Sequence, residues 1–171
     1  PAQARQQVAI PEQDEDGDGQ VDILDGLPVG RYEQENAQYF GAELSAEATF
    51  TKYLGGFVSL DTVRAKLTDV GLNIPRIPPS RARLGLDFRY EGFSLRPEVV
   101  FASEQTKLFP LETRTAGYGI VNVGGSYTIG QQHLAHILTF NAYNLTDKLY
   151  RNHSSFIKDL MPEIGRGIRF G

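Results

Sequence analysis

The eleven residues FGAELSAEATF, residues 40–50, alternate without a break between two kinds of side chain. The even positions carry apolar side chains: Phe40, Ala42, Leu44, Ala46, Ala48 and Phe50. The odd positions carry glycine or polar side chains: Gly41, Glu43, Ser45, Glu47 and Thr49. Successive side chains of a β-strand point to opposite faces of a sheet, whereas a helix repeats about every 3.6 residues. The stretch therefore predicts a strand with one apolar and one polar face.

The same alternation recurs along the chain. It is clear in residues 82–90, 93–101, 121–129 and 138–143. A further strand is expected near residues 57–67, where the phase is ambiguous because a bulge would shift it. A last strand begins within residues 167–171. We therefore expect an all-β chain with six strands, the start of a seventh and little helix.

The connections between the expected strands alternate in length. They are short at 52–56, 91–92 and 130–135, long at 68–80, 103–117 and 145–166, and the segment 1–38 before the first strand is long too. An antiparallel up-and-down transmembrane β-barrel has this pattern, because its periplasmic turns are tight and its extracellular loops are long. A soluble antiparallel sheet with one wet face is the alternative, but it gives no reason for the alternation. We favour the membrane barrel.

The faces and lengths of the expected strands agree with a barrel wall. Charged side chains share one face: Glu43, Glu47, Arg83, Asp87, Arg89, Arg96 and Glu98. Aromatic side chains lie toward strand ends on the other face: Phe40, Phe50, Tyr90 and Phe93. A strand of about 11 residues tilted by about 45° spans roughly 25 Å, the height of an outer-membrane apolar band. Bacterial barrels of this kind have even strand numbers from about eight upward, so about seven strands are expected to belong to a larger barrel.

Composition excludes several other classes of protein. The 171 residues include no cysteine, so neither a disulfide nor a thiolate metal site is possible. The net charge of −4 divides into −9 over residues 1–50, with two Arg against eleven Asp and Glu, and +5 over residues 51–171, with fifteen Lys and Arg against ten Asp and Glu. This balance lacks the concentrated basic face of a nucleic-acid-binding protein. No run of about 18 apolar residues predicts a transmembrane helix.

The stretch NLTDKLYRNHSSFIKDLMPEIGRGIRFG, residues 144–171, resembles the C-terminal end of TonB-dependent outer-membrane receptors. The matching residues are Asn144, Leu145, Asp147, Tyr150, His153, Ser155, Phe156, Lys158, Asp159, Gly165 and Arg166. Two further stretches, IPRIPPSRARLGLDF (74–88) and DGLPVGRYEQENAQYFGAELSAE (25–47), are similar to the same family in the same order and spacing. The three stretches look most like the zinc- and haem-associated branch.

The resemblance implies a barrel of about 22 strands in the bacterial outer membrane, with a plug domain inside. Such receptors perform no covalent chemistry. They import scarce nutrients such as ferric siderophores, haem or zinc, with energy relayed through TonB. Residues 1–38 are then expected to form an extracellular loop and residues 39–171 the C-terminal strands, while the plug domain and the N-terminal strands are absent from this sequence.

Placed on this topology, several side chains could meet the transported nutrient. Three arginines are expected near the barrel mouth: Arg76, Arg81 and Arg83. Cations there could attract an anionic chelate. Pairing of these arginines with carboxylates of the barrel interior, such as Glu43 or Asp87, is the alternative that we favour. His153 falls in an outer loop, where it could contribute to substrate binding.

The stretch DEDGDGQVDILD, residues 14–25, matches the twelve-residue calcium loop. Its candidate Ca²⁺ ligands are Asp14, Asp16, Asp18, Gln20 (through its backbone carbonyl), Asp22 and Asp25. Gly19 stands where the loop needs a sharp turn, and no amphipathic helices flank it, so it is not an EF-hand. We expect a structural Ca²⁺ that orders an outer loop. The alternative is a solvated acidic loop.

Two other interpretations are weighed against the receptor. An enzymatic barrel would need a catalytic constellation, and we find no nucleophile–base pair, paired catalytic carboxylates or phosphate-binding glycine loop. His133 and His136 should not share a metal, because strand positions three apart face opposite sides. A soluble, calcium-stabilised β-sandwich used in surface adhesion remains the alternative, and it would fold without a membrane.

Overall fold

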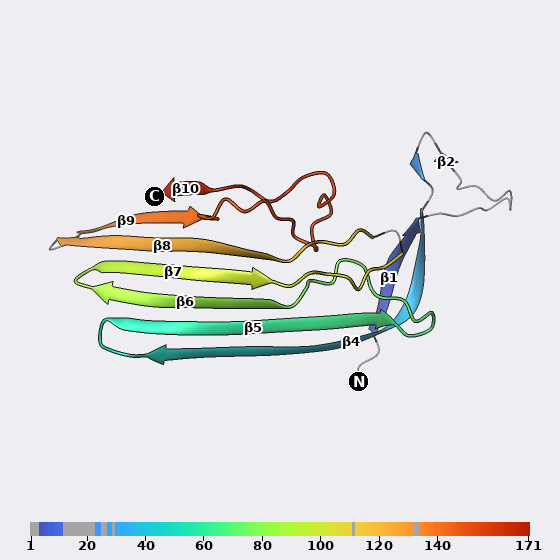
Figure 1. Ribbon diagram of the computed structural model, residues 1–171, viewed down its shortest axis with the longest axis horizontal. Coiled ribbons are helices and arrows are strands. Elements are labelled where there is room, and N and C mark those ends of the chain that lie inside the picture. The colour runs from blue at the N-terminus through green and yellow to red at the C-terminus, as the bar shows by residue number, and fades with distance from the viewer. Residues whose placement is uncertain (1–3, 12–22, 25–26, 29, 111, 132–133) are drawn as a thin grey trace.

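The computed structural model describes residues 4–11, 23–24, 27–28, 30–110, 112–131 and 134–171. Eight strands form one antiparallel sheet (Figure 1): β1 (Ala4–Pro11), β4 (Gly30–Thr49), β5 (Leu54–Leu67), β6 (Arg81–Tyr90), β7 (Phe93–Ala102), β8 (Tyr118–Gln131), β9 (Leu134–Tyr143) and β10 (Gly167–Phe170). Two short strands, β2 (Ile23–Leu24) and β3 (Leu27–Pro28), pair with each other. No helix in this part of the chain is long and apolar enough to cross a membrane.

The sheet is up-and-down, because from β4 to β10 each strand pairs with the next one along the chain. Figure 1 shows short connections at one end of the sheet, which we call the turn end, and long ones at the other, the loop end. The first, second and third long loops are residues 68–80, 103–117 and 144–166. The expected alternation of short and long connections is confirmed, and with it the all-β antiparallel architecture.

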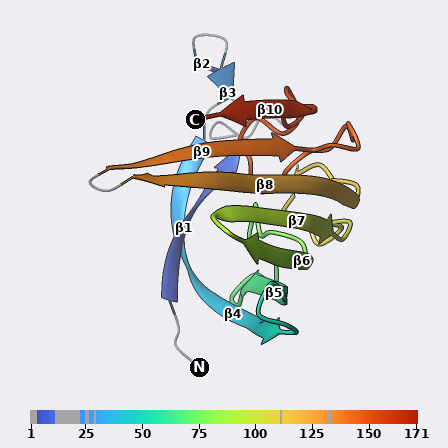
Figure 2. The same ribbon diagram turned by 90° about the vertical axis from the view of Figure 1, so that its left-hand side faces the viewer.

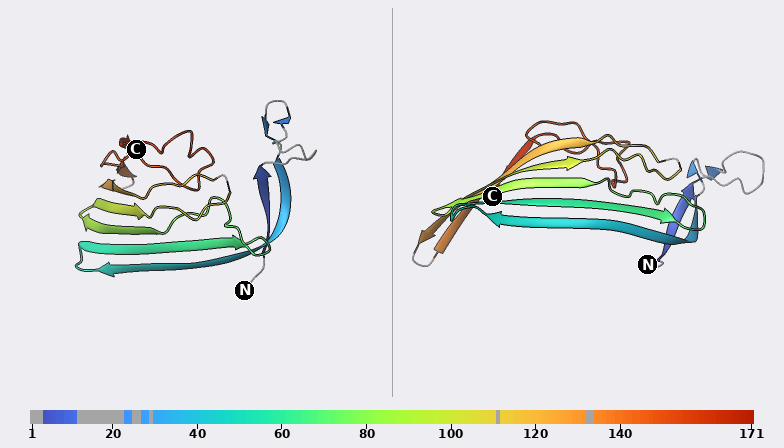
Figure 3. Two further views of the ribbon diagram at one scale, coloured as in Figure 1. Left: turned by 45° about the vertical axis from the view of Figure 1, so that its right-hand side comes forward. Right: turned by 60° about the horizontal axis from the view of Figure 1, so that its bottom comes forward.

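Regular pairing at the N-terminal side begins earlier than residue 39. β4 starts at Gly30 and pairs with β1 from Ala4↔Ala37 to Pro11↔Gly30. Figure 3 shows β1 and the beginning of β4 bending away from the other strands. The sequence RYEQENAQ, residues 31–38, has no apolar alternation, yet strands pair through their backbone groups and can do so without it.

β5 has an unbroken register with β4, from Ala37↔Leu67 to Thr49↔Gly55, so the bulge considered for this strand is not present. Its polar face carries Ser59 and Asp61, but also Phe57 and Val63. Two apolar side chains on the polar face explain why the phase of alternation is ambiguous in the sequence.

The two faces of the sheet keep their chemistry from strand to strand. On the apolar face the register aligns Val58 with Leu84, Leu84 with Val99, and Val99 with Val121. This face is not covered by any second layer of described residues, and Phe40 remains 75% exposed. A band of uncovered apolar side chains is what a barrel presents to lipid.

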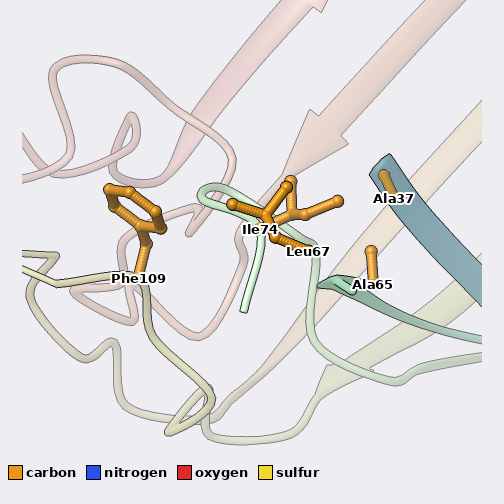
Figure 4. Packing of buried hydrophobic residues seen from close by; sticks show 5 residues of the cluster. All are labelled: Ala37, Ala65, Leu67, Ile74 and Phe109. Atoms are coloured by element: carbon orange, nitrogen blue, oxygen red, sulfur yellow. The ribbon is translucent and has the colours of Figure 1, made fainter. Parts of the chain in front are cut away.

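The buried core lies under the long loops at the loop end. It contains Ala37, Ala65, Leu67, Ile74 and Phe109, with Ile77 packed against them (Figure 4). The alternation of β4 and β5 places the first three of these on the polar face. The loops therefore fold over the polar face of the sheet.

The sheet is curved but open. β1 and β10 are its outermost strands: among the described residues β1 pairs only with β4, and β10 pairs only with β9 (Figure 2 views the sheet from the turn end). A β-sandwich needs two packed sheets, whereas the only other described sheet is the two-stranded pair β2–β3. The soluble sandwich interpretation is therefore not supported.

Candidate functional site: the loop cluster over the polar face

The three long loops are hydrogen-bonded to one another at the loop end. Gln105 Nε2 of the second long loop donates to Ile77 O of the first at 2.8 Å. Lys158 Nζ of the third long loop donates to Thr113 O of the second at 2.7 Å. We call the three joined loops the loop cluster. It is the part of the described chain in which buried polar groups gather.

Glu112 of the second long loop is the centre of the loop cluster. Its Oε1 accepts a hydrogen bond from the backbone N–H of Arg76 in the first long loop at 2.8 Å. Its Oε2 accepts from the backbone N–H of Phe109 at 3.1 Å. The same Oε1 lies 3.1 Å from Nε2 of His153 in the third long loop. One carboxylate thus contacts all three loops.

His153 is only 1% exposed and is held from both ring nitrogens. Nδ1 lies 3.0 Å from the Thr115 hydroxyl. Nε2 lies 3.1 Å from Glu112 Oε1, although the geometry is not that of a regular hydrogen bond. Burial lowers the pKa of His153; Glu112 opposes that shift and Lys158 adds to it. His153 is therefore neutral at pH 7.

Lys158 is a buried cation whose charge is compensated within the cluster. Its ammonium group donates to the carbonyl and the hydroxyl of Thr113 and lies 3.4 Å from Asp159 Oδ2. The Thr113 hydroxyl donates to the other carboxylate oxygen of Asp159. That hydrogen bond, together with the charge of Lys158, lowers the pKa of Asp159. These contacts among Lys158, Thr113 and Asp159 join the third long loop to the second, and the carboxylate of Asp159 compensates the charge of Lys158.

Arg76 is a half-buried cation of the loop cluster whose side chain contacts an exposed aromatic ring. Its guanidinium carbon lies 3.6 Å from the ring centroid of Phe156, a side chain that is 84% exposed. Arg76 also has a left-handed backbone, with φ of 59°, which is costly for a residue with a Cβ atom. The bond from its N–H to Glu112 holds that conformation, so the pair of Arg76 and Phe156 is presented at a fixed place.

The sequence analysis names four residues that could contact the substrate, and the structure brings two of them to Glu112: Arg76 through its backbone N–H and His153 through its ring. Arg81 and Arg83 stand on β6 and pair with Asp61 at 2.9 Å and Glu98 at 2.8 Å. Because His153 is enclosed, it does not reach a substrate in this arrangement. Its role here is to position the loops.

Two of the three arginines that we expected to pair with interior carboxylates do so, Arg81 and Arg83, whereas Arg76 forms no ion pair with another described residue. The ion pairs on the polar face are Arg81–Asp61 (2.9 Å), Arg83–Glu98 (2.8 Å), Arg89–Asp87 (3.3 Å) and Arg96–Asp87 (3.8 Å). Asp87 is one of the two partners named in advance, but it serves Arg89 and Arg96 instead of the expected arginines. Interior charge is thus largely compensated.

Asn144 has a structural role that the sequence did not indicate. It directly follows β9, has a φ of 48° and is 1% exposed. Its Nδ2 donates to Lys148 O at 2.9 Å and its Oδ1 accepts from Lys148 N at 2.9 Å, while its own N–H donates to Asn122 Oδ1 at 2.9 Å. Asparagine tolerates this left-handed backbone conformation better than most residues. In the sequence, only the Asn-Leu-x-Asp element marked this position, and it did not indicate the hydrogen bonds that Asn144 forms.

The predicted calcium ligands lie outside the described residues. These are Asp14, Asp16, Asp18, Gln20, Asp22 and Asp25. His133 is outside them as well. In the part of the chain that the structure describes, no group of three or more His, Asp or Glu side chains is arranged to hold a metal ion.

Two comparisons with known proteins bear on this architecture. A family model described as TonB dependent receptor-like, beta-barrel matches residues 8–145. Among solved structures, the chain is similar to one titled "Copper transporter OprC", with 22% sequence identity and a TM-score of 0.72. That match covers 81% of this chain and 24% of the other, so the chain spans about a quarter of the length of that protein. At this identity the likeness shows the fold.

Proposed function

This chain belongs to the family of TonB-dependent receptor-like β-barrels, and we propose that it forms part of the barrel of an active transporter that takes up a scarce nutrient across the bacterial outer membrane. The family consists of outer-membrane transport proteins and not of enzymes. TonB would supply the energy through a plug domain. The expected family and location follow from the match over residues 8–145; the transport activity and its cargo are our proposal.

The observation that carries this proposal is the position of the loop cluster. Three long loops, joined through Glu112, cover the polar face at one end of the sheet, whereas the turn end has only short connections. A wall with one elaborated end and one plain end fits a receptor that captures a nutrient on one side of the membrane only.

We propose that the cargo is a metal chelate or a related nutrient such as a siderophore, haem or zinc. Copper joins these candidates because the similar structure is titled a copper transporter. Arg76 and Phe156 offer a cation and an aromatic ring at the surface of the loop cluster, a pairing that suits an anionic, partly aromatic chelate. Interior arginines contribute less, because carboxylates already pair with them.

An uptake assay tests the transport proposal. The gene for the whole receptor is deleted and restored, and cells limited for iron, zinc or copper are given labelled ferric siderophore, haem, zinc or copper. We expect saturable uptake of one of these that is lost on deletion and equally lost without TonB. Uptake that continues without TonB would contradict active transport.

The cargo contact is tested by Arg76→Gln in the whole receptor. We expect uptake at low cargo concentration to fall about tenfold, as is typical when a charged hydrogen-bond donor to a ligand is removed. Arg114→Gln is the matched control, because Arg114 is an exposed arginine of the second long loop that lies 3.6 Å from Glu104. Equal effects of the two substitutions would remove Arg76 from the cargo site.

We further propose that residues 14–25 bind a structural Ca²⁺. The support is the positional match of alternating oxygen ligands to the twelve-residue calcium loop, together with the modest affinity that suffices at about millimolar extracellular calcium. Limited proteolysis of the whole receptor tests this. Cleavage within the stretch should slow in calcium, not in magnesium, and Asp14→Ala, which removes the ligand at the first position of the loop, should abolish the protection. Cleavage at the same rate with and without calcium would leave only a solvated acidic loop.

A further inference from the structure

The third long loop buries polar side chains and exposes apolar ones. His153 is 1% exposed and Lys158 is 5% exposed, whereas Leu160 is 81% exposed, Ile164 65% and Met161 61%. Single apolar side chains on a surface are ordinary, but several of them in one short segment mark a contact surface. This segment therefore has the composition of a contact surface that the described residues do not cover.

A single turn of the backbone gathers the exposed apolar side chains. The N–H groups of Leu160 and Met161 both donate to Ile157 O, at 3.0 and 2.9 Å. Residues three and four apart in such a turn share one side, so Ile157, which is 50% exposed, lies on the side of Leu160 and Met161. Pro162 follows and cannot continue the turn, because it has no N–H to donate. We call Ile157, Leu160, Met161 and Ile164 the seam patch.

Polar contacts hold the loop in place at both ends of the seam patch. Near its start, Lys158 Nζ donates to Thr113 O of the second long loop at 2.7 Å. Near its end, the N–H of Glu163 donates to Tyr150 O at 2.9 Å. Turning the apolar side chains inward would expose these buried polar groups in their place, so the patch is presented to the outside by the fold itself.

The seam patch lies at the open margin of the sheet. β10 begins at Gly167, three residues after Ile164, and Figure 1 shows the third long loop beside β10 on the side of the sheet opposite β4. Among the described residues β10 pairs only with β9, so its other edge is free. A strand edge in a membrane must be paired, which means that another strand lies against β10 in the closed barrel. The loop end of that strand then comes next to the seam patch.

We propose that the seam patch closes the barrel at its loop end. Its four side chains pack against aliphatic or aromatic side chains of the segment that joins the strand paired with β10. That segment belongs to the part of the receptor outside these 171 residues, which cover 24% of the similar solved chain. Phe156 instead stacks on Arg76 and is left for the cargo contact proposed above. The patch thus has a structural partner, separate from the transported nutrient.

Oxidation of Met161 tests whether the patch is covered, without any substitution, because it is the only methionine of the 171 residues. The whole receptor in detergent, free of cargo, is treated with hydrogen peroxide, and the sulfoxide at Met161 is followed by peptide mass spectrometry. We expect oxidation at least about tenfold slower than in the urea-unfolded receptor, since a covered thioether reacts only when the contact opens. Equal rates in the folded and unfolded receptor would overturn the proposal.

Cysteine labelling identifies what covers the patch. The 171 residues contain no cysteine, so Leu160→Cys adds one reactive site, and Val70→Cys, at a 52% exposed apolar position of the first long loop, is the matched control. In the cargo-free whole receptor, a maleimide should modify Leu160→Cys at least about tenfold more slowly than Val70→Cys at every receptor concentration. Equal rates would contradict the contact. Protection seen only at high receptor concentration would assign the patch to a second copy, and protection seen only with added ferric siderophore, haem, zinc or copper would assign it to the cargo; either outcome overturns the proposal.

The double substitution Leu160→Asp/Ile164→Asp tests whether the contact helps to close the barrel. We expect the fraction of whole receptor that becomes protease-resistant on refolding into vesicles to fall at least about fivefold, because two unpaired carboxylates would be buried at the seam. Val70→Asp should refold normally. Normal refolding of Leu160→Asp/Ile164→Asp would show that the seam does not need the patch. Refolding and labelling of the cargo-free receptor do not depend on uptake, so a failure here is distinguishable from a failure of the transport proposal.

Discussion

At the scale of single residues, Gly85 illustrates how the polar face packs without a second layer. The ring of Phe57, from the neighbouring strand, covers Gly85 so closely that a Cβ atom there would collide with it and would lie 3.0 Å from Pro97 O. The guanidinium of Arg96 lies 4.3 Å from the centroid of the same ring. A glycine, an aromatic ring and a cation from three consecutive strands therefore stack on the polar face.

We predict that Gly85→Ala destabilises the folded barrel by about 1–3 kcal/mol, the usual cost of overpacking. The measurement is the urea unfolding midpoint of the whole receptor in detergent. Gly130→Ala is the control, because no atom lies within 4 Å of the Cβ that it would add. The double variant Gly85→Ala/Phe57→Ala should recover part of the loss, and a Gly85→Ala variant as stable as Gly130→Ala would refute the stack.

His153 gives a pH dependence whose sign follows from its burial. Its folded pKa lies below the ordinary value of 6.5, so between the two values the opened loop binds a proton that the closed loop does not. The closed third long loop is therefore most stable above about pH 6.5, and it loses stability as the pH falls from that value toward the pKa of His153 in the folded protein. The charged groups that face the ring are Glu112, Lys158 and Asp159.

We expect hydrogen exchange of the third long loop, corrected for intrinsic rates, to show more opening at pH 5.5 than at pH 7.5. His153→Gln should remove the difference, because glutamine does not titrate. A pH dependence that persists in His153→Gln would place the titrating group elsewhere. The sequence identified His153 as an outer-loop residue but not its burial, since burial depends on Glu112 and Thr115 from another loop.

At the scale of elements, alternation predicted those strands whose two faces differ in chemistry. β6 and β7 stand close to the expected residues 82–90 and 93–101. β1 and the start of β4 were missed because their pairing uses the backbone and leaves no periodic signal. The ladder between β6 and β7 is interrupted beside Pro97, a proline inside a central strand, whose ring leaves no N–H to donate.

The two faces should respond differently to charge. We predict that Leu84→Lys on the apolar face costs up to about 2–4 kcal/mol of barrel stability, because a charge on the lipid face is desolvated. Ser45→Lys on the polar face should cost far less, since Ser45 is exposed and stands between Glu43 and Glu47 on the same face of β4. The measurement is the fraction of whole receptor that folds into vesicles, judged by resistance to urea. Similar losses for the two variants would contradict the assignment of faces.

At the scale of the whole molecule, the curved sheet has an uncovered apolar face and two outer strands, β1 and β10. Local patterns indicated a wall of this kind, but the size of the barrel is set by strand tilt and register over the complete ring, which no local pattern contains. That information came from the resemblance of residues 144–171 to a known family. The calcium loop, which lies outside the described residues, stays a prediction.

The open edges determine how this segment should behave by itself. Unpaired backbone groups at β1 and β10 would each cost several kcal/mol in lipid, and the apolar face would be exposed in water, so neither solvent suits the isolated sheet. We predict that the 171-residue chain, refolded alone with lipid vesicles, gives no protease-resistant barrel. The whole receptor treated in the same way should give one, and adding the missing part as a separate chain should restore resistance to this segment, because it supplies the partners of both outer strands. A protease-resistant monomer formed by the 171 residues alone would mean that β1 and β10 can close a small barrel, and the larger barrel would then not be required.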